Sequence, residues 1–188
     1  MNESVVLSIN DDIWLEEAER CPSPNYNDRP QARVDLLVIH NISLPPNQFG
    51  GRFVHDFFLN QLNVGYHPYF ETIVDVKVSA HFFIDRKGAI TQFVPLNKRA
   101  WHAGVSCFRG EDNCNDFSLG VELEGADDIP YTDEQYATLS KLTKQLQQLF
   151  PAITNDRIAG HATIAPERKT DPGPAFDWQH YRQLLAKK

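Results

Sequence analysis

Three residues spread along the chain have side chains of the types that can bind zinc. His40 follows a short apolar run, residues 36–39, while His161 and Asp171 lie at either end of a segment rich in proline. Two imidazoles and one carboxylate give zinc three protein ligands and leave its fourth position for water, as in catalytic zinc sites. The three residues are far apart in the sequence, so the pattern alone leaves metal binding and ordinary packing equally open.

A zinc hydrolase also needs a general base for its water and a cation for the oxyanion. Glu122 and Glu124 lie in an otherwise apolar run, where a carboxylate is costly to bury unless it is paired or takes part in catalysis. Alternation puts both glutamates on one face of a strand, so it does not identify which of them is the general base. The alternative to a catalytic role is that this face is solvated and both are ordinary surface carboxylates. Lys169 is the candidate cation; its alternative is an ordinary surface lysine.

The chain has seven histidines, more than packing requires, so the others need their own interpretation. We expect surface or packing roles for His55, His67 and His180. His81 lies inside an apolar run, which favours a core histidine satisfied by a hydrogen bond over a metal ligand.

Short apolar runs predict the strands that must position these side chains. Residues 36–39 (LLVI) have no polar interruption, which is typical of a strand buried on both faces. Residues 78–85 and 89–94 are joined by Arg86-Lys87-Gly88, a connection short enough for a hairpin. Residues 118–125 (SLGVELEG) predict a further strand.

The clearest helical pattern covers residues 133–150. Thr132 can cap this helix, Gln135 can complete a capping box, and Pro151 ends the pattern. The apolar side chains at helical spacing are Tyr136, Leu139, Leu142, Leu146 and Leu149.

Three further helices are expected. Asp177 can cap the last one, and another is predicted over residues 52–62. A short helix over residues 12–20 would present Ile13 and Trp14 to the rest of the domain.

Strands interleaved with helices predict an α/β (α+β) layered domain, with a central mixed β-sheet flanked by helices. A chain of 188 residues fits one domain. We therefore expect a single domain over residues 1–188, with residues 1–31 as an N-terminal helix and irregular segment packed on it.

Composition and charge exclude several classes of function. The net charge of −7 repels nucleic acid and anionic lipid at long range, and no apolar run is long enough to cross a bilayer. The N-terminal MNESVVLSINDD lacks the features of a secretory signal, so we expect a cytoplasmic protein. Three cysteines without metal or redox spacing predict reduced thiols. Nothing in the sequence calls for an obligate protein partner.

Several blocks of the sequence form a specific pattern. They are LLVIHNISLPP at 36–46, HPYF at 67–70, VSAHFFI at 78–84, RAWHAGVS at 99–106, CNDFSLGVELEG at 114–125, GH at 160–161 and IAPERKTDPG at 164–173. Together they closely resemble the type-2 amidase and peptidoglycan-recognition family over residues 21–185. The resemblance implies the fold of a type-2 amidase.

The resemblance also implies a mechanism. A zinc ion would be held by His40, His161 and Asp171, with Glu122 as the acid/base and Lys169 stabilising the transition state. It thereby selects Glu122 over Glu124. The implied reaction is hydrolysis of the amide bond between anhydro-N-acetylmuramic acid and L-alanine in cytoplasmic muropeptides, a step of cell-wall recycling.

Substrate contacts and competing functions are less sharply implied. Tyr69 and Trp101 offer flat faces for a sugar or peptide, and Asn41 can bond a peptide amide, but each is equally well a scaffold residue. Lys77 and Asn113 stand where some relatives carry arginines, which would alter binding of the peptide's carboxylates. The alternatives are an amidase acting on intact cell wall outside the cytoplasm and a recognition module that binds muropeptides without cutting them.

Overall fold

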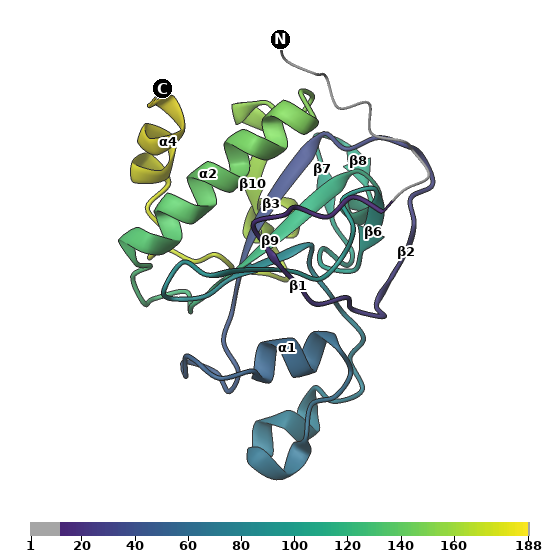
Figure 1. The fold of residues 1–188 in the computed structure, drawn as a ribbon, viewed down its shortest axis with the longest axis vertical. Coiled ribbons are helices and arrows are strands. Elements are labelled where there is room, and N and C mark those ends of the chain that lie inside the picture. Colours follow the sequence, from purple (N-terminus) through teal and green to yellow (C-terminus); the bar gives the residue numbers. More distant parts are fainter. Residues whose placement is uncertain (1–11, 188) are drawn as a thin grey trace.

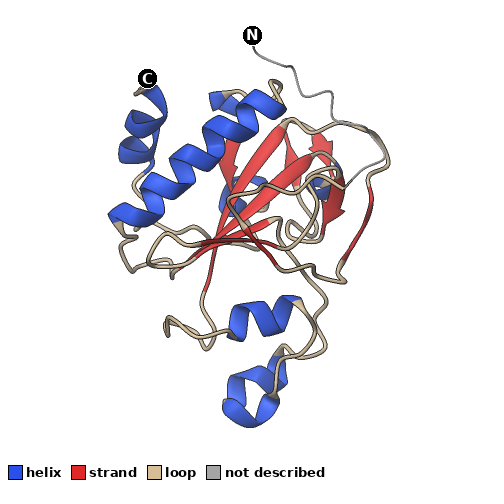
Figure 2. Cartoon of the chain, in the orientation of Figure 1, coloured by secondary structure: helices blue, strands red, loops and turns tan. Residues whose placement is uncertain are grey.

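The computed structural model describes residues 12–187 and contains a central mixed sheet with helices packed against it (Figures 1 and 2). The strand order is β1-β5-β4-β9-β3-β10, and only the β4–β5 pair is antiparallel. These strands are β1 (Glu19–Arg20), β3 (Leu36–Ile42), β4 (Phe82–Ile84), β5 (Ile90–Gln92), β9 (Ser118–Glu124) and β10 (Ile158–Gly160). The predicted α/β class is confirmed. The predicted single domain over 1–188 extends beyond the described residues and stays a prediction.

Two small ladders lie beside this sheet. They are β2 (Tyr26–Asp28) with β6 (Lys98–Ala100), and β7 (Cys107–Phe108) with β8 (Glu111–Asp112). The 3-10 turns are η1 (Val64–Tyr66), η2 (Pro68–Thr72), η3 (Cys114–Asp116) and η4 (Asn155–Arg157).

The central strands β3 and β9 are buried on both faces, as their apolar runs predict. On one face Leu37 and Ile39 pack into the core below helices α2 (Asp133–Leu149) and α4 (Trp178–Ala186), which lie side by side (Figure 1). On the other face Leu36 and Val38 pack into a smaller cluster, and the same alternation continues to His40. The helices thus cover one face and leave the end of the other for a site.

Helix α2 forms as predicted and ends one residue before the expected end. Thr132 Oγ1 accepts a hydrogen bond from Gln135 N, and Thr132 N donates to Gln135 Oε1, which completes the capping box. Asp177 caps α4 through a hydrogen bond from His180 N, as expected.

The predicted helix over residues 52–62 is shorter, since α1 covers only Phe53–Phe58. Asn60 adopts a positive φ of 59°, a left-handed conformation that stops the helix. α1, η1 and η2 form a small lobe at one end of the sheet (Figure 1), where Phe58, Phe70 and Phe93 share an apolar cluster.

The predicted helix over residues 12–20 is wrong. The Gln92 side chain accepts a hydrogen bond from Leu15 N and donates to Ile13 O, so this backbone bonds to the sheet, and its own bond from Ala18 N to Leu15 O closes only a turn. The segment then enters the sheet as β1, parallel to β5. Leu15 packs in the core with Ile13 at its margin, so contacts distant in sequence override the local helical pattern.

Other boundaries also changed. β3 runs three residues beyond the predicted 36–39, residues 78–81 lie outside β4, and the predicted hairpin is confirmed only over its paired core, Phe82–Ile84 with Ile90–Gln92. Within residues 12–187 we find no helix with the length and hydropathy of a membrane span. All three cysteines are free thiols.

Candidate metal centre and active-site cleft

The structure brings the three predicted zinc ligands together. His40 Nδ1 lies 3.0 Å from both His161 Nδ1 and Asp171 Oδ2, and the last two atoms are 3.1 Å apart. Their nitrogen and oxygen atoms therefore converge on one point at which a metal ion could be held.

Local folding explains the convergence. β10 pairs in parallel with β3, so His161, the first residue of the short helix α3 (His161–Ile164), emerges beside His40. The loop after α3 returns, and Ala162 N donates to the carbonyl oxygen of Asp171 at 2.9 Å. The sequence pattern did not predict β10 (Ile158–Gly160), the strand that delivers His161 to the site.

The hydrogen bonds of the two imidazoles fit a cation at this point. His161 Nε2 lies 3.0 Å from the carbonyl oxygen of Ala103, which only accepts, so Nε2 carries the proton and Nδ1 presents a lone pair. Burial lowers the pKa of His40 to about 4, although Asp171 partly opposes the shift, so this ring is neutral at physiological pH. Two imidazole lone pairs and a carboxylate are a donor set suited to zinc.

Glu122 lies beside the metal centre because β9 pairs with β3 in a register that places it opposite His40. Its side chain lines the cleft, while Oε2 is buried and hydrogen-bonds to no other residue in the described part of the chain. Burial raises the pKa of Glu122 well above its usual value, and the charge of Asp171 adds to this rise, whereas Lys169 opposes it. A carboxyl with a raised pKa is a stronger base when it is ionised, so it can accept a proton from water and later return it.

Glu124 is on the same face of β9 but has a different environment. Its carboxylate accepts hydrogen bonds from Gly50 N and Arg86 N, so it ties two loops to the end of the strand. The structure therefore separates two glutamates that strand alternation treats alike.

A cleft of about 520 Å³ opens over the metal centre. Lys169, Asn41 and Tyr69 line it together with His40 and Glu122. Apolar side chains of α1 and of the segment that follows η2 form another wall: Phe57, Phe58, Ile73, Val76 and Val78. The cleft thus joins a polar, titratable floor to an apolar wall.

The predicted substrate contacts differ in position. Tyr69 is partly exposed in the cleft, and Asn41 Nδ2 donates to Asp127 Oδ1 at 2.9 Å. Trp101 lies outside the cleft lining, with its indole N–H donating to Asn27 Oδ1 at 2.8 Å. Lys77 is exposed between two cleft-lining valines, and Asn113 is exposed in the turn before η3.

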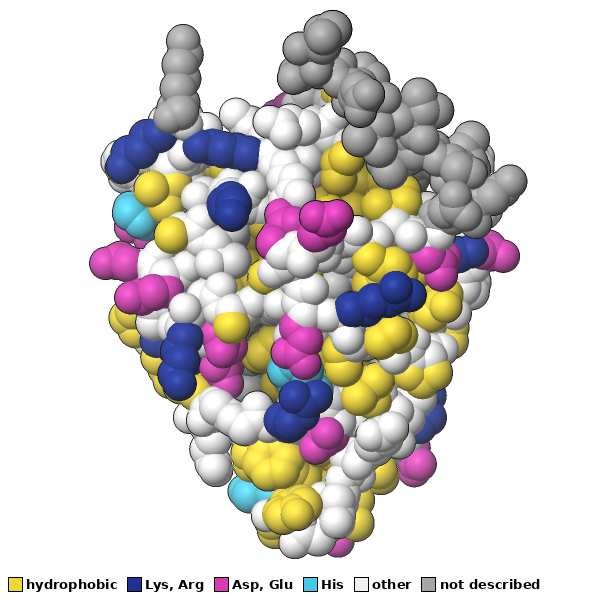
Figure 3. All heavy atoms as spheres, viewed as in Figure 1, with side chains coloured by type: hydrophobic (Ala, Val, Ile, Leu, Met, Phe, Trp, Pro, Cys, Tyr) yellow, Lys and Arg dark blue, Asp and Glu magenta, His cyan; other side chains and the backbone are white. Residues whose placement is uncertain are grey.

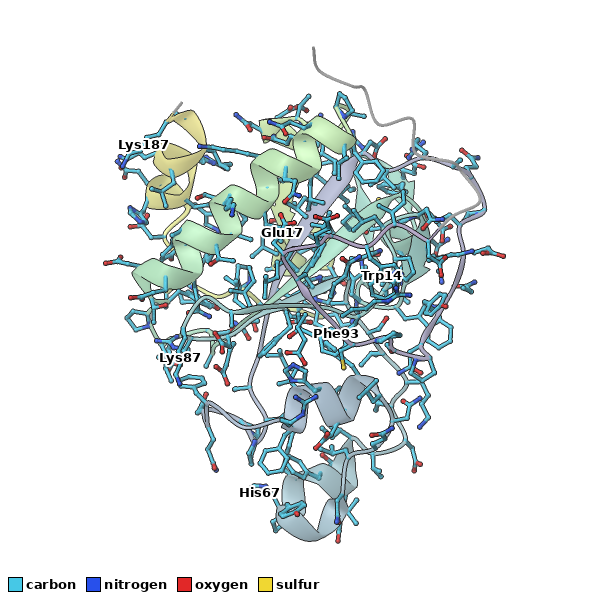
Figure 4. All side chains as sticks on the ribbon, in the orientation of Figure 1. Trp14, Glu17, His67, Lys87, Phe93 and Lys187 are labelled. Atoms are coloured by element: carbon cyan, nitrogen blue, oxygen red, sulfur yellow. The ribbon has the colours of Figure 1, made fainter. Side chains whose placement is uncertain are left out.

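The other histidines take the packing roles expected of them. His55 is buried and its Nε2 lies 3.1 Å from Thr91 Oγ1. His67 lies in the small lobe, where its Nδ1 accepts from Tyr69 N (Figure 4). His180 packs edge-on against Tyr136. His81 is fully buried, accepts from Gly120 N and donates to the carbonyl oxygen of Lys98.

One buried histidine was missed by sequence reasoning. His102 Nδ1 lies 2.9 Å from His40 Nε2, so this ring contacts a predicted ligand from behind. Its position in the block RAWHAGVS is the only sequence signal that could have identified it.

The comparisons with known proteins agree with this geometry. The family model described as N-acetylmuramoyl-L-alanine amidase (Amidase_2) matches residues 30–174. A relative from Citrobacter freundii, named 1,6-anhydro-N-acetylmuramyl-L-alanine amidase AmpD, is 53% identical over 93% of this chain and 94% of its own. A crystal structure of a selenomethionine AmpD derivative has a TM-score of 0.90 at 52% identity, covering 93% of this chain and 98% of that one.

A more distant structure carries a ligand. It is the Escherichia coli amidase AmiD in complex with the substrate anhydro-N-acetylmuramic acid-L-Ala-D-γ-Glu-L-Lys. The match has a TM-score of 0.59 and 32% identity, and it covers 81% of this chain and 57% of that one.

Proposed function

Since this chain belongs to the N-acetylmuramoyl-L-alanine amidase family, we propose that it is a zinc-dependent enzyme of cell-wall recycling. Its reaction is hydrolysis of the amide bond between anhydro-N-acetylmuramic acid and L-alanine in muropeptides. The names of its AmpD relatives support the bond, and the AmiD complex supports the class of substrate. One observation carries the proposal: three convergent metal donors lie beside the half-buried Glu122, whose buried Oε2 finds no partner within residues 12–187.

The three donors His40, His161 and Asp171 would hold the zinc ion. When bound, zinc supplies Lewis-acid chemistry, because it lowers the pKa of water and polarises a carbonyl. Glu122 takes the proton of the attacking water and later gives it to the amine of L-alanine as the amide bond breaks. The ammonium group of Lys169 stabilises the negative charge that develops on the carbonyl oxygen.

The cleft supports this class of substrate. A sugar with a short peptide needs an apolar wall as well as polar groups that fix its orientation. Tyr69 and Asn41 are our candidates for these contacts, since both line the cleft. Trp101 stays a prediction, because its indole is bonded to Asn27 outside the lining.

Chromatography of purified protein with anhydro-N-acetylmuramoyl-tripeptide tests the proposal. We expect the zinc-loaded protein to release free tripeptide, a chelated sample to release none, and intact cell-wall sacculi to stay undigested. Stoichiometric binding without release would instead identify a recognition module, and digestion of sacculi an enzyme of the intact wall. The expected cytoplasmic location is part of the proposal and is checked by cell fractionation.

A further inference from the structure

Two consecutive residues, His102 and Ala103, contact the imidazoles of His40 and His161 on the side away from the metal position. His102 Nδ1 lies 2.9 Å from His40 Nε2, and the carbonyl oxygen of Ala103 lies 3.0 Å from His161 Nε2. In each ring this is the nitrogen opposite the one that faces the metal position. One short segment therefore contacts the two ligands that come from β3 and α3.

A single amide side chain holds this segment. Asn115 Oδ1 accepts hydrogen bonds from the backbone N–H groups of both His102, at 3.1 Å, and Ala103, at 2.8 Å. Asn115 is itself buried in η3, and its backbone carbonyl oxygen accepts a hydrogen bond from Arg29 Nη1. Arg168 Nη2 also donates to the carbonyl oxygen of Ala103, at 2.6 Å, which further restrains that carbonyl.

Contacts with strand β9 restrain the His102 ring as well. A Cβ atom added to Gly120 would lie 2.6 Å from His102 Cγ, so the ring packs directly on the backbone of β9. His102 Nε2 lies 3.1 Å from Ser118 Oγ on the same strand. The ring therefore has little freedom to turn away from His40.

These contacts select one tautomer of each ligand. For His40 Nδ1 to offer a lone pair to a metal, His40 Nε2 must carry the proton and donate to His102 Nδ1. His102 Nε2 then carries a proton and donates to Ser118 Oγ. The carbonyl oxygen of Ala103 imposes the matching tautomer on His161. Such partners orient the ligands of metal sites and tighten metal binding.

We propose that His102 and Asn115 are positioning residues that hold both imidazole ligands ready for the metal, His102 through its ring and Asn115 through the backbone of residues 102 and 103. This inference rests on the metal site of the proposed function. It assigns a role to two side chains that do not touch the metal.

Zinc affinity of the metal-free protein, measured by competition with a chromophoric chelator, tests the inference without reference to activity. We expect Asn115→Ala and His102→Phe to bind zinc about 10–100-fold more weakly than the unchanged protein. Asn115→Asp keeps an oxygen that accepts from both N–H groups, so it should bind zinc nearly as tightly as the unchanged protein.

Gln92→Ala is the matched control. Gln92 is another buried amide that binds backbone groups, those of Leu15 and Ile13, on a strand that does not supply a ligand. This variant should lower the Tm of the metal-free protein and leave its zinc affinity unchanged. The same thermal measurement on the other variants separates loss of positioning from loss of folding.

The outcomes separate this inference from the proposed function. Unchanged zinc affinity in Asn115→Ala and His102→Phe would overturn the inference while leaving the metal site intact. Equal losses in Asn115→Asp and Asn115→Ala, or in Gln92→Ala, would also overturn it, because the effect would then follow stability alone. An unchanged protein that binds no zinc would overturn the metal site of the proposed function and the inference with it.

Discussion

Glu122 and Glu124 illustrate how the surroundings of a residue determine its role. Both carboxylates lie on one face of β9, but only Glu124 has its oxygens taken up by backbone N–H groups. Burying a carboxyl without partners lowers stability, and such groups are concentrated where they serve chemistry. At the residue scale, Glu122 is therefore the group whose removal should affect turnover most selectively.

Glu122→Gln should keep zinc and the fold but lose about two to four orders of magnitude in kcat, because the amide cannot carry the proton. Single-turnover and steady-state assays with anhydro-N-acetylmuramoyl-tripeptide measure the loss. Glu124→Gln is the control: it should retain most of its turnover and lose about 1–3 kcal/mol of unfolding free energy through a mismatched hydrogen bond. Near-normal kcat in Glu122→Gln would remove Glu122 from the mechanism.

The raised pKa of Glu122 also predicts how stability depends on pH. Because burial raises the pKa in the folded state above that of the unfolded state, the protonated carboxyl makes a more favourable contribution to the stability of the fold than the ionised one. This contribution is present below the unfolded pKa and is lost as pH rises through the folded pKa. Glutamine has no proton to lose, so metal-free Glu122→Gln should gain Tm relative to the unchanged protein as pH rises from about 5 to 8. A Tm difference that stays constant with pH would contradict this reading.

At the scale of elements, three parallel strands act as the scaffold of the site. β9, β3 and β10 are neighbours, and their carboxyl ends carry or precede Glu122, His40 and His161. Parallel neighbours place the ends of their strands along one edge of the sheet, which is why ligands of such sheets bind there. Helix α2 packs on the other face and supports the strands without entering the site.

Thr132→Ala tests this separation of support from chemistry. Loss of the cap should lower the free energy of unfolding by about 1 kcal/mol, because Gln135 N loses its acceptor at the start of α2. Urea denaturation measures the change, and kcat should stay as in the unchanged protein. Thr72→Ala, which removes an exposed hydroxyl bonded to the carbonyl of Tyr69, should change stability less. A large fall in kcat for Thr132→Ala would show that α2 has a direct part in catalysis.

At the scale of the molecule, a bound ion would link segments that are far apart in the chain. His40 and Asp171 are 131 positions apart, and His161 lies between them at the end of another strand. An ion held by all three binds only the folded chain, so it stabilises the whole domain.

Zinc should therefore raise the Tm of the metal-free protein. Zinc at 100 times its Kd would add about 2.7 kcal/mol to the free energy of unfolding. Differential scanning calorimetry of chelated and zinc-loaded protein measures the shift. His40→Ala should show neither the shift nor amidase activity. A full zinc equivalent bound to that variant, with the shift preserved, would remove His40 from the site.

The charge of the whole molecule contributes little to substrate capture. Acidic and basic side chains are interspersed on the face shown in Figure 3, and the net charge is −7. A field of this sign does not attract a muropeptide with free carboxylates. Under the proposed function, binding would therefore depend on groups inside the cleft, among which Lys169 is the candidate cation.

Local patterns in the sequence determined several elements correctly. The capping box of Thr132 and Gln135 and the apolar stripe after it predict α2 to within one residue, because helix hydrogen bonds and caps connect neighbours in the chain. The uninterrupted runs at β3 and β9 predict buried strands, since both their faces need apolar side chains. The blocks that carry the family resemblance predicted the fold class and the set of candidate ligands.

The remaining features arise only when distant parts of the chain come together in the fold. Segment 12–20 exchanges a local helix for hydrogen bonds to Gln92, and β10, three residues long, has no periodicity of its own and exists through pairing with β3. The different surroundings of Glu122 and Glu124, and the contact of His102 with His40, arise from residues distant in sequence. These features depend on contacts between separate strands and loops, whose energies no single stretch of the sequence contains.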